Sequence, residues 1–201
     1  MSESGLQTTD DSAVAPPAAS QAHRPARTRE MVTAALLAAL LAASAWISIP
    51  VGAVPLTLQV FIVLLAGLLL TPRGAFSAVG VYVLLGAAGL PVFAGGLGGA
   101  GVLAGPTGGY LWGFVLAAVV VASVRRIAVT PRFATLVDAV ALLLGVAVIY
   151  LIGWAQLAAV TGMGVWPAFA AGVAPFVAID ALKAVVALGV ARALGRAGVV
   201  R

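Results

Sequence analysis

The chain has 201 residues, of which 63% are hydrophobic and 8% are charged, and its formal net charge is +5. Soluble domains carry about 25% charged residues, so this composition excludes an ordinary soluble protein and predicts an integral membrane protein. Cysteine is absent, which excludes disulfides, thiolate metal ligands and a cysteine nucleophile.

Residues 1–29 are rich in Ser, Thr, Ala and Pro. Such a segment buries too little apolar surface to offset the entropy of ordering, so we expect a disordered tail over 1–29. Prolines such as Pro25 are expected to break any helix there. The tail lacks the apolar core of a secretory signal peptide. His23, the one histidine, lies in the tail and is given no role.

Six apolar stretches follow the tail, each close to the about 20 residues that cross a bilayer core. They cover residues 31–49, 56–71, 75–90, 107–124, 133–154 and 170–191. A segment with two prolines and a glycine, 49–55, is expected to be a loop. The predicted fold is an all-α integral membrane protein with six transmembrane helices. Its membrane domain covers 30–196, and a short cytoplasmic end follows at 197–201.

The basic residues predict the orientation. Ten of the eleven lie in the tail, after the second stretch, after the fourth stretch or at the carboxyl end, and the eleventh is Lys183. Because cytoplasmic loops carry the excess of Lys and Arg, both termini are expected to be cytoplasmic. The positive charge then reports orientation, and no nucleic-acid partner is predicted.

Small residues form a smooth face on the first stretch. Its two adjacent rows at i, i+4 spacing are Ala34, Ala38 and Ala42, and Ala35, Ala39 and Ala43. Small residues let transmembrane helices approach closely. The face serves either internal packing or the docking of another protein, and the sequence favours neither.

The glycine-rich segment 92–110 contains Gly96, Gly98 and Gly101 at G-x-G-x-x-G spacing. A dinucleotide site is rejected, because the flanks are membrane stretches and no acidic residue follows until Asp138. Irregular backbone near a membrane is tolerated where protein covers it or where it lines a cavity. The segment is either a flexible external loop or, as we prefer, a lid over a binding cavity.

Three acidic or basic residues interrupt the apolar stretches. Asp138 lies near the start of the fifth stretch, and we interpret it as a helix-end charge or an arginine partner rather than a proton carrier. Asp180 and Lys183 are three residues apart, so a helix places both on one face. At 1.5 Å per residue, they would lie about 15 and 20 Å below the outer end of the sixth stretch.

The Asp180–Lys183 pair has two interpretations. A charge at the bilayer centre costs about 2.5–3.5 kcal/mol, so such a pair has a purpose. It is either a structural ion pair or a ligand site, and we favour the ligand site. An intramembrane enzyme is disfavoured, because neither H-E-x-x-H nor G-x-S-x-G occurs, and no catalytic or metal-binding residue is predicted.

Four motifs together resemble the BioY family, the biotin-binding S components of energy-coupling factor (ECF) vitamin transporters. They are VPLTLQ at 54–59, GLPVFAGG at 89–96, GPTGGY at 105–110, and the Asp180-x-x-Lys183 pair. Their order and spacing match over about residues 31–192.

This resemblance implies a six-helix fold in the cytoplasmic membrane, an external biotin pocket and no cofactor. It also implies that the alanine-rich helix docks on a membrane-embedded T component, which works with a pair of ATPase subunits. Asp180 and Lys183 map onto ligand-binding residues of the family. The alternatives are a solitary or proton-coupled small-vitamin carrier and an S component for a different vitamin.

The chemistry of biotin suggests further contacts. An aspartate can accept from its ureido N–H groups, and a lysine can donate to its ureido carbonyl or its carboxylate. Which end of biotin meets Lys183 stays open. The remaining candidate binding residues are Gln59, Phe93, Gly95, Gly96, Tyr110 and Trp154.

Overall fold

The computed structural model describes residues 24–127 and 131–198. Predictions for 1–23 and 199–201 lie outside this part of the chain. The first helix, α1 (Arg24–Ser44), begins earlier than expected, so the predicted disordered tail is wrong for residues 24–29. Pro25 does not break this helix, because it lies in the first turn, where no intrahelical N–H bond is required.

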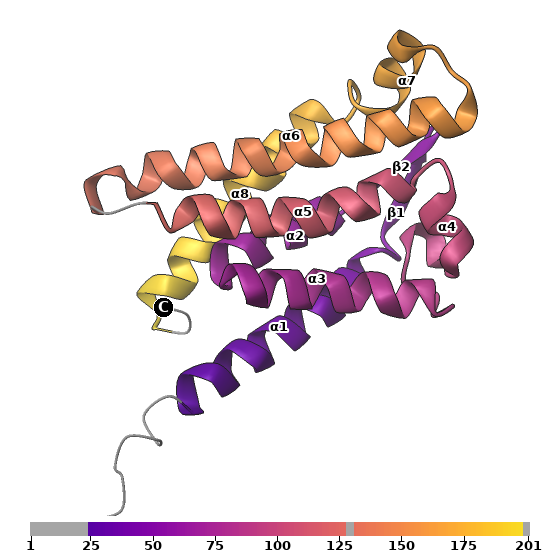
Figure 1. Ribbon diagram of the computed structural model, residues 1–201. Coiled ribbons are helices and arrows are strands. Elements are labelled where there is room, and N and C mark those ends of the chain that lie inside the picture. The colour runs from indigo at the N-terminus through magenta and orange to yellow at the C-terminus, as the bar shows by residue number, and fades with distance from the viewer. Residues whose placement is uncertain (1–23, 128–130, 199–201) are drawn as a thin grey trace, which may run out of the picture.

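The remaining elements form a bundle with short connecting segments (Figure 1). They are β1 (Ser48–Val51), β2 (Val54–Thr57), α2 (Gln59–Leu69), α3 (Pro72–Ala87), η1 (Ala94–Gly96), α4 (Ala100–Ala104), α5 (Gly108–Arg125), η2 (Pro131–Phe133), α6 (Ala134–Thr161), α7 (Val165–Gly172) and α8 (Val177–Arg196). The bundle is mostly helical, as predicted.

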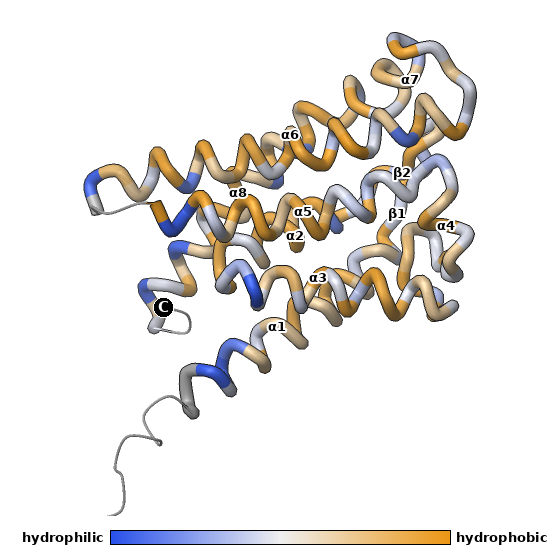
Figure 2. The backbone as a smooth tube through the Cα atoms, in the orientation of Figure 1, coloured by the Kyte–Doolittle hydropathy of each residue, from blue (hydrophilic) through white to orange (hydrophobic). Residues whose placement is uncertain are grey.

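Among the described residues, α5 and α6 are each long and apolar enough to cross a membrane. The pair α7 and α8 meets the same criterion together but is bent by 47° at its break. Helix α2 is apolar but only 11 residues long, and it is buried along most of its length against its neighbours. Apolar residues dominate all of these helices (Figure 2). The protein is therefore a membrane protein by helix length and composition.

A β-hairpin replaces the loop expected at 49–55, so the fold is not purely α-helical. Strands β1 and β2 are antiparallel, with Ser48 opposite Thr57. Gly52 has a φ of 70°, the left-handed conformation that tight hairpin turns require. Pro50 and Pro55 lie opposite each other; among residues 24–127 and 131–198 both strands are edge strands, where a missing N–H is tolerated.

The sixth apolar stretch is two helices rather than one. Helix α7 ends at Gly172 and α8 begins at Val177. Pro175 lies in the break and cannot continue a helix, which explains it. Asp180 consequently lies in the first turn of α8 instead of deep within an unbroken helix, and the depths of about 15 and 20 Å do not apply.

The fifth stretch also differs in length, because α6 continues past Trp154 to Thr161. It ends where Gly162 adopts the left-handed conformation typical of a helix C-terminus. At its other end, Asp138 Oδ1 lies 3.2 Å from Arg125 Nε. The arginine-partner interpretation of Asp138 is confirmed, and this ion pair joins the end of α5 to the start of α6.

The two alanine rows of α1 have different surroundings. Ala34, Ala38 and Ala42 are half-buried, and Ala34 and Ala42 pack against the core. Ala35, Ala39 and Ala43 are exposed. One row therefore contributes to internal packing, while the other faces away from the bundle.

Candidate ligand-binding cavity

Asp180 and Lys183 form a buried ion pair on α8. Lys183 Nζ lies 2.7 Å from Asp180 Oδ1, and the two residues are 8% and 2% exposed, respectively. Both line the same cavity. The prediction that the pair points at one common volume is confirmed.

Lys183 has a second partner outside its own helix. Its ammonium group donates a 2.7 Å hydrogen bond to the main-chain oxygen of Thr57, at the end of β2. An ammonium group has three N–H donors. Within the described residues two of them are used, which leaves one for a ligand.

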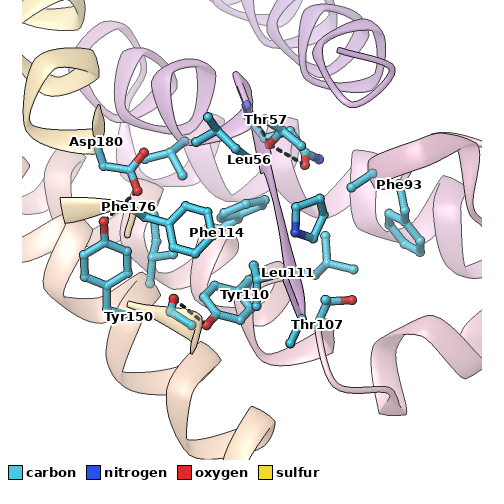
Figure 3. Close-up of a pocket in the computed structure, with 18 of the residues that line it drawn as sticks. Leu56, Thr57, Phe93, Thr107, Tyr110, Leu111, Phe114, Tyr150, Phe176 and Asp180 are labelled. Atoms are coloured by element: carbon cyan, nitrogen blue, oxygen red, sulfur yellow. Dashed lines mark hydrogen bonds between the residues drawn. The ribbon is translucent and has the colours of Figure 1, made fainter. Parts of the chain in front are cut away.

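Asp180 is oriented by a tyrosine that sequence analysis missed. Tyr150, on α6, donates a 2.7 Å hydrogen bond to Asp180 Oδ2 (Figure 3). Each carboxylate oxygen thus has one donor and can still accept another. The available signal was a tyrosine in the apolar middle of α6, where its hydroxyl group needs a partner.

A second polar group adjoins the ion pair. Gln59 lines the cavity and is 3% exposed. Its side-chain oxygen accepts from the Thr57 hydroxyl group at 2.9 Å, and its amide nitrogen donates to the Tyr82 hydroxyl group. These bonds fix the orientation of the amide and leave it one N–H donor.

The rest of the cavity wall is mainly apolar and aromatic. The cavity has a volume of about 250 Å³, close to the lower end of the about 300–1,000 Å³ typical of small-molecule sites. Asp180 and Tyr150 lie at one end, and Phe93 and Thr107 lie at the other (Figure 3). The aromatic lining residues are Phe93, Tyr110, Phe114, Tyr150 and Phe176. Of these, Phe114, Tyr150 and Phe176 were not predicted.

Two predicted aromatic contacts have different outcomes. Tyr110 lines the cavity, and its hydroxyl group donates to Gly172 O at 2.8 Å, which holds α7 against α5. Trp154 does not line the cavity. Its indole N–H donates to Val165 O, and its ring packs edge-on against Phe169. The structure therefore does not bring Trp154 to the cavity wall.

The glycine-rich segment reaches the cavity through the predicted Phe93 and through further apolar residues that were not predicted. Phe93, Leu97 and Val102 line it, whereas Gly95 and Gly96 do not. Gly95 instead donates its main-chain N–H to Ala45 O at 3.2 Å. The two glycines shape the segment, since both have positive φ, and its apolar side chains form the wall.

This arrangement is suited to binding. A desolvated carboxylate and ammonium group offer directional hydrogen bonds at one end, and aromatic walls exclude water elsewhere. Fold and cavity together define a membrane protein that binds a small ligand with both a polar and an apolar part.

The chain belongs to the BioY family, whose sequence model matches residues 17–198. It is 44% identical over 168 residues to the "Probable biotin transporter BioY" of Pyrococcus horikoshii, covering 84% of this chain and 97% of that protein. It is 38% identical over 175 residues to the "Biotin transporter BioY" of Rhizobium etli, covering 83% and 93%.

A solved structure confirms the fold. The crystal structure of the S-component for biotin from an ECF-type ABC transporter superposes with a TM-score of 0.79. The alignment covers 86% of this chain and 94% of that chain, at 24% sequence identity. At this sequence identity, the superposition shows that the two proteins share a fold.

Proposed function

We propose that this protein binds biotin and serves as the substrate-capture subunit of a biotin uptake system. The observation that carries the proposal is the buried Asp180–Lys183 pair in an aromatic cavity, in a chain that aligns with biotin transporters over most of its length. The BioY family is a family of transporters, not of enzymes.

Biotin matches the remaining hydrogen-bonding capacity of the cavity. Its ureido group has two N–H donors, and the Asp180 carboxylate can accept further hydrogen bonds. The free N–H donor of Lys183 fits the ureido carbonyl or the carboxylate of biotin. The fused rings need an apolar enclosure, and Phe114 and Phe176 line the same cavity as the ion pair.

We place the protein in the cytoplasmic membrane with six spans: α1, α2, α3, α5, α6 and the bent pair α7–α8. Ten of the eleven basic residues would then be cytoplasmic. Hydrophilic residues at the start of α1, the start of α3, the end of α5, in η2 and at the end of α8 gather toward the left of Figure 2. The hairpin, α4 and α7 lie toward the right, which would be the outer side.

Transport would depend on partners. The proposed assembly contains a membrane-embedded T component and a pair of ATPase subunits, which would hydrolyse the ATP. The exposed alanine row of α1 supports a docking surface, because small residues permit close helix contact. A proton-coupled carrier receives less support, because the Asp138 carboxylate forms an ion pair with Arg125.

Calorimetry with the purified protein tests the proposal. Biotin should bind in a one-to-one ratio, and mass spectrometry of protein purified from biotin-containing medium should detect it. Titration with other vitamins of similar size serves as the control. Failure to bind biotin, or tighter binding of another vitamin, would overturn the assignment of the ligand.

A further inference from the structure

The segment 93–107, here called the cover segment, forms the end of the cavity away from Asp180. It contains η1, α4 and six glycines. Its cavity-lining residues are Phe93, Ala94, Leu97, Val102 and Thr107. Glycine loses more conformational freedom on ordering than any other residue, so a glycine-rich wall needs specific contacts to hold it in place.

The first half of the cover segment is held by main-chain hydrogen bonds. Gly95 N–H donates to Ala45 O at 3.2 Å, and Gly99 N–H donates to Gly86 O at 2.7 Å. These bonds connect it to the end of α1 and to α3. Because both partners in each bond are main-chain atoms, the conformation of the backbone, and not the identity of a side chain, determines whether these bonds form.

The second half is held by one side chain. The amide nitrogen of Gln156, on α6, donates to Leu103 O and to Gly105 O, each at 2.8 Å. Both oxygens lie at the C-terminal end of α4, where carbonyl groups lack the partners of a further helical turn; Gly105 O also accepts a 3.1 Å hydrogen bond from the main-chain N–H of Gly108. In the described part of the chain, Gln156 provides the side-chain hydrogen bonds to the main chain of this segment.

The start of α5 leaves room for this contact and for nothing larger. A Cβ atom on Gly108 would lie 1.9 Å from Leu103 O and 2.6 Å from the Gln156 amide nitrogen. A Cβ atom on Gly109 would lie 2.7 Å from Gln156 Cβ. Two adjacent glycines therefore allow α4, α5 and α6 to meet around the Gln156 amide.

From this geometry we infer that Gln156 is a positioning residue that holds the cover segment closed and thereby sets the rates at which ligand enters and leaves. Gln156 does not itself line the cavity, so it acts through the cover segment. The identity of the ligand rests on the function proposed above; the role of Gln156 rests on the contacts.

The kinetic consequence is specific. Opening the second half of the cover segment breaks both Gln156 bonds, and two neutral hydrogen bonds favour the closed form by about tenfold. Their loss raises the open fraction, so ligand enters and leaves faster. Loss of a direct ligand contact would instead raise the dissociation rate alone, and disruption of the cavity would reduce the number of binding sites.

The test compares Gln156→Leu with the control Trp154→Phe. Both changes remove a side-chain donor on α6 that bonds to an outer main-chain carbonyl, but the Trp154 bond goes to α7, away from the cavity. With labelled biotin, Gln156→Leu should raise the association and dissociation rates about tenfold each, with stoichiometry kept. Trp154→Phe should change neither. Unchanged rates for Gln156→Leu, or equal changes in both variants, would overturn the inference.

A second measurement needs no ligand. Because the chain lacks cysteine, Val102→Cys gives a single thiol in the cavity wall. Adding Gln156→Leu should raise its labelling rate by a maleimide about tenfold. Adding Trp154→Phe should leave it unchanged. Gln156→Met, which removes both donors at similar length, should act like Gln156→Leu and replaces it if that variant does not fold.

The two measurements separate the two hypotheses. Absence of biotin binding in the wild-type protein would refute the proposed ligand, while the labelling rates still test Gln156. Equal labelling with and without the Gln156 substitutions would refute the role of Gln156, whatever the ligand is.

Discussion

Lys183 Nζ donates a 2.7 Å hydrogen bond to the main-chain oxygen of Thr57, which is 126 residues earlier in the chain. This bond ties α8 to the end of the β-hairpin at the wall of the cavity. The same nitrogen also bonds to Asp180. Lys183 therefore combines a structural contact with a position suited to ligand binding, and substitution there should affect both.

We first predict the effect of breaking the ion pair. Asp180→Asn and Lys183→Met should each weaken biotin binding by more than about tenfold, because the remaining charge is left unpaired, at about 2–5 kcal/mol. Calorimetry measures the affinity, and size-exclusion chromatography in detergent checks folding. Lys183→Met should also lower the melting temperature more than Asp180→Asn does, since it removes the bond to Thr57.

The double variant separates ligand binding from structural pairing. If Asp180 and Lys183 share one ligand and each other, the double variant should lose much less binding energy than the sum of the two single variants. Near-wild-type affinity in both single variants would leave the structural ion pair as the correct interpretation.

A smaller effect is expected at Tyr150. Tyr150→Phe removes the hydroxyl group that donates to Asp180 Oδ2 but keeps the ring in the cavity wall. One hydrogen bond to a charged group contributes about 1.5–3 kcal/mol, of which a ligand or water donor can restore part. Biotin affinity should fall about three- to tenfold by calorimetry. The exposed Trp112→Phe on α5 is the control and should bind normally.

Sequence patterns predicted the polar end of the cavity better than its walls. Asp180, Lys183 and Gln59 stand out because polar residues are rare in an apolar chain, and all three line the cavity. Phe114 and Phe176 resemble any other apolar residue in a helix, so their place depends on how the helices pack. Trp154 lies outside the cavity lining for the same reason, because the rotation of α6 about its axis decides which of its residues face the cavity.

Local backbone chemistry explains the errors in the fold. The hairpin at Ser48–Thr57 resembles a loop by its prolines, and only the pairing of two short strands identifies it. Pro175 was a signal for the break in the sixth apolar stretch, but the hydropathy of the whole stretch suggested a single span. The sequence predicted that Asp138 could pair with an arginine, because Asp138 and Arg125 lie at the ends of helices that follow one another in the chain.

That second ion pair should contribute to stability and not to binding. Asp138 has an 8% exposed side chain, so Arg125→Gln leaves a mostly buried carboxylate without its partner. Because the Arg125 side chain is itself 39% exposed, we expect the free energy of unfolding to fall by about 1–3 kcal/mol. Breaking a fully buried ion pair would cost more, about 3–5 kcal/mol. Thermal unfolding in detergent measures it. Adding Asp138→Asn should recover part of the loss, and biotin affinity should not change in either variant.

Labelling of single cysteines tests the proposed orientation. The chain lacks cysteine, so Ile49→Cys, Ala100→Cys and Met163→Cys each introduce one exposed thiol in the hairpin, α4 and the α6–α7 connection. All three should react with a membrane-impermeant maleimide added to intact cells, whereas Arg73→Cys should react only after lysis. Reaction of Arg73→Cys in intact cells would contradict the six-span arrangement.

The alanine rows of α1 give the last prediction. A tryptophan at exposed Ala39 would not disturb the bundle, but it would hold a docking helix away. Ala39→Trp should therefore keep biotin affinity and abolish both co-purification with the T component and ATP-driven uptake. Ala38→Trp, in the half-buried row, should instead reduce folding yield and biotin binding together. If Ala39→Trp still forms a complex and transports biotin, the exposed row is not the docking surface, and α1 faces lipid there.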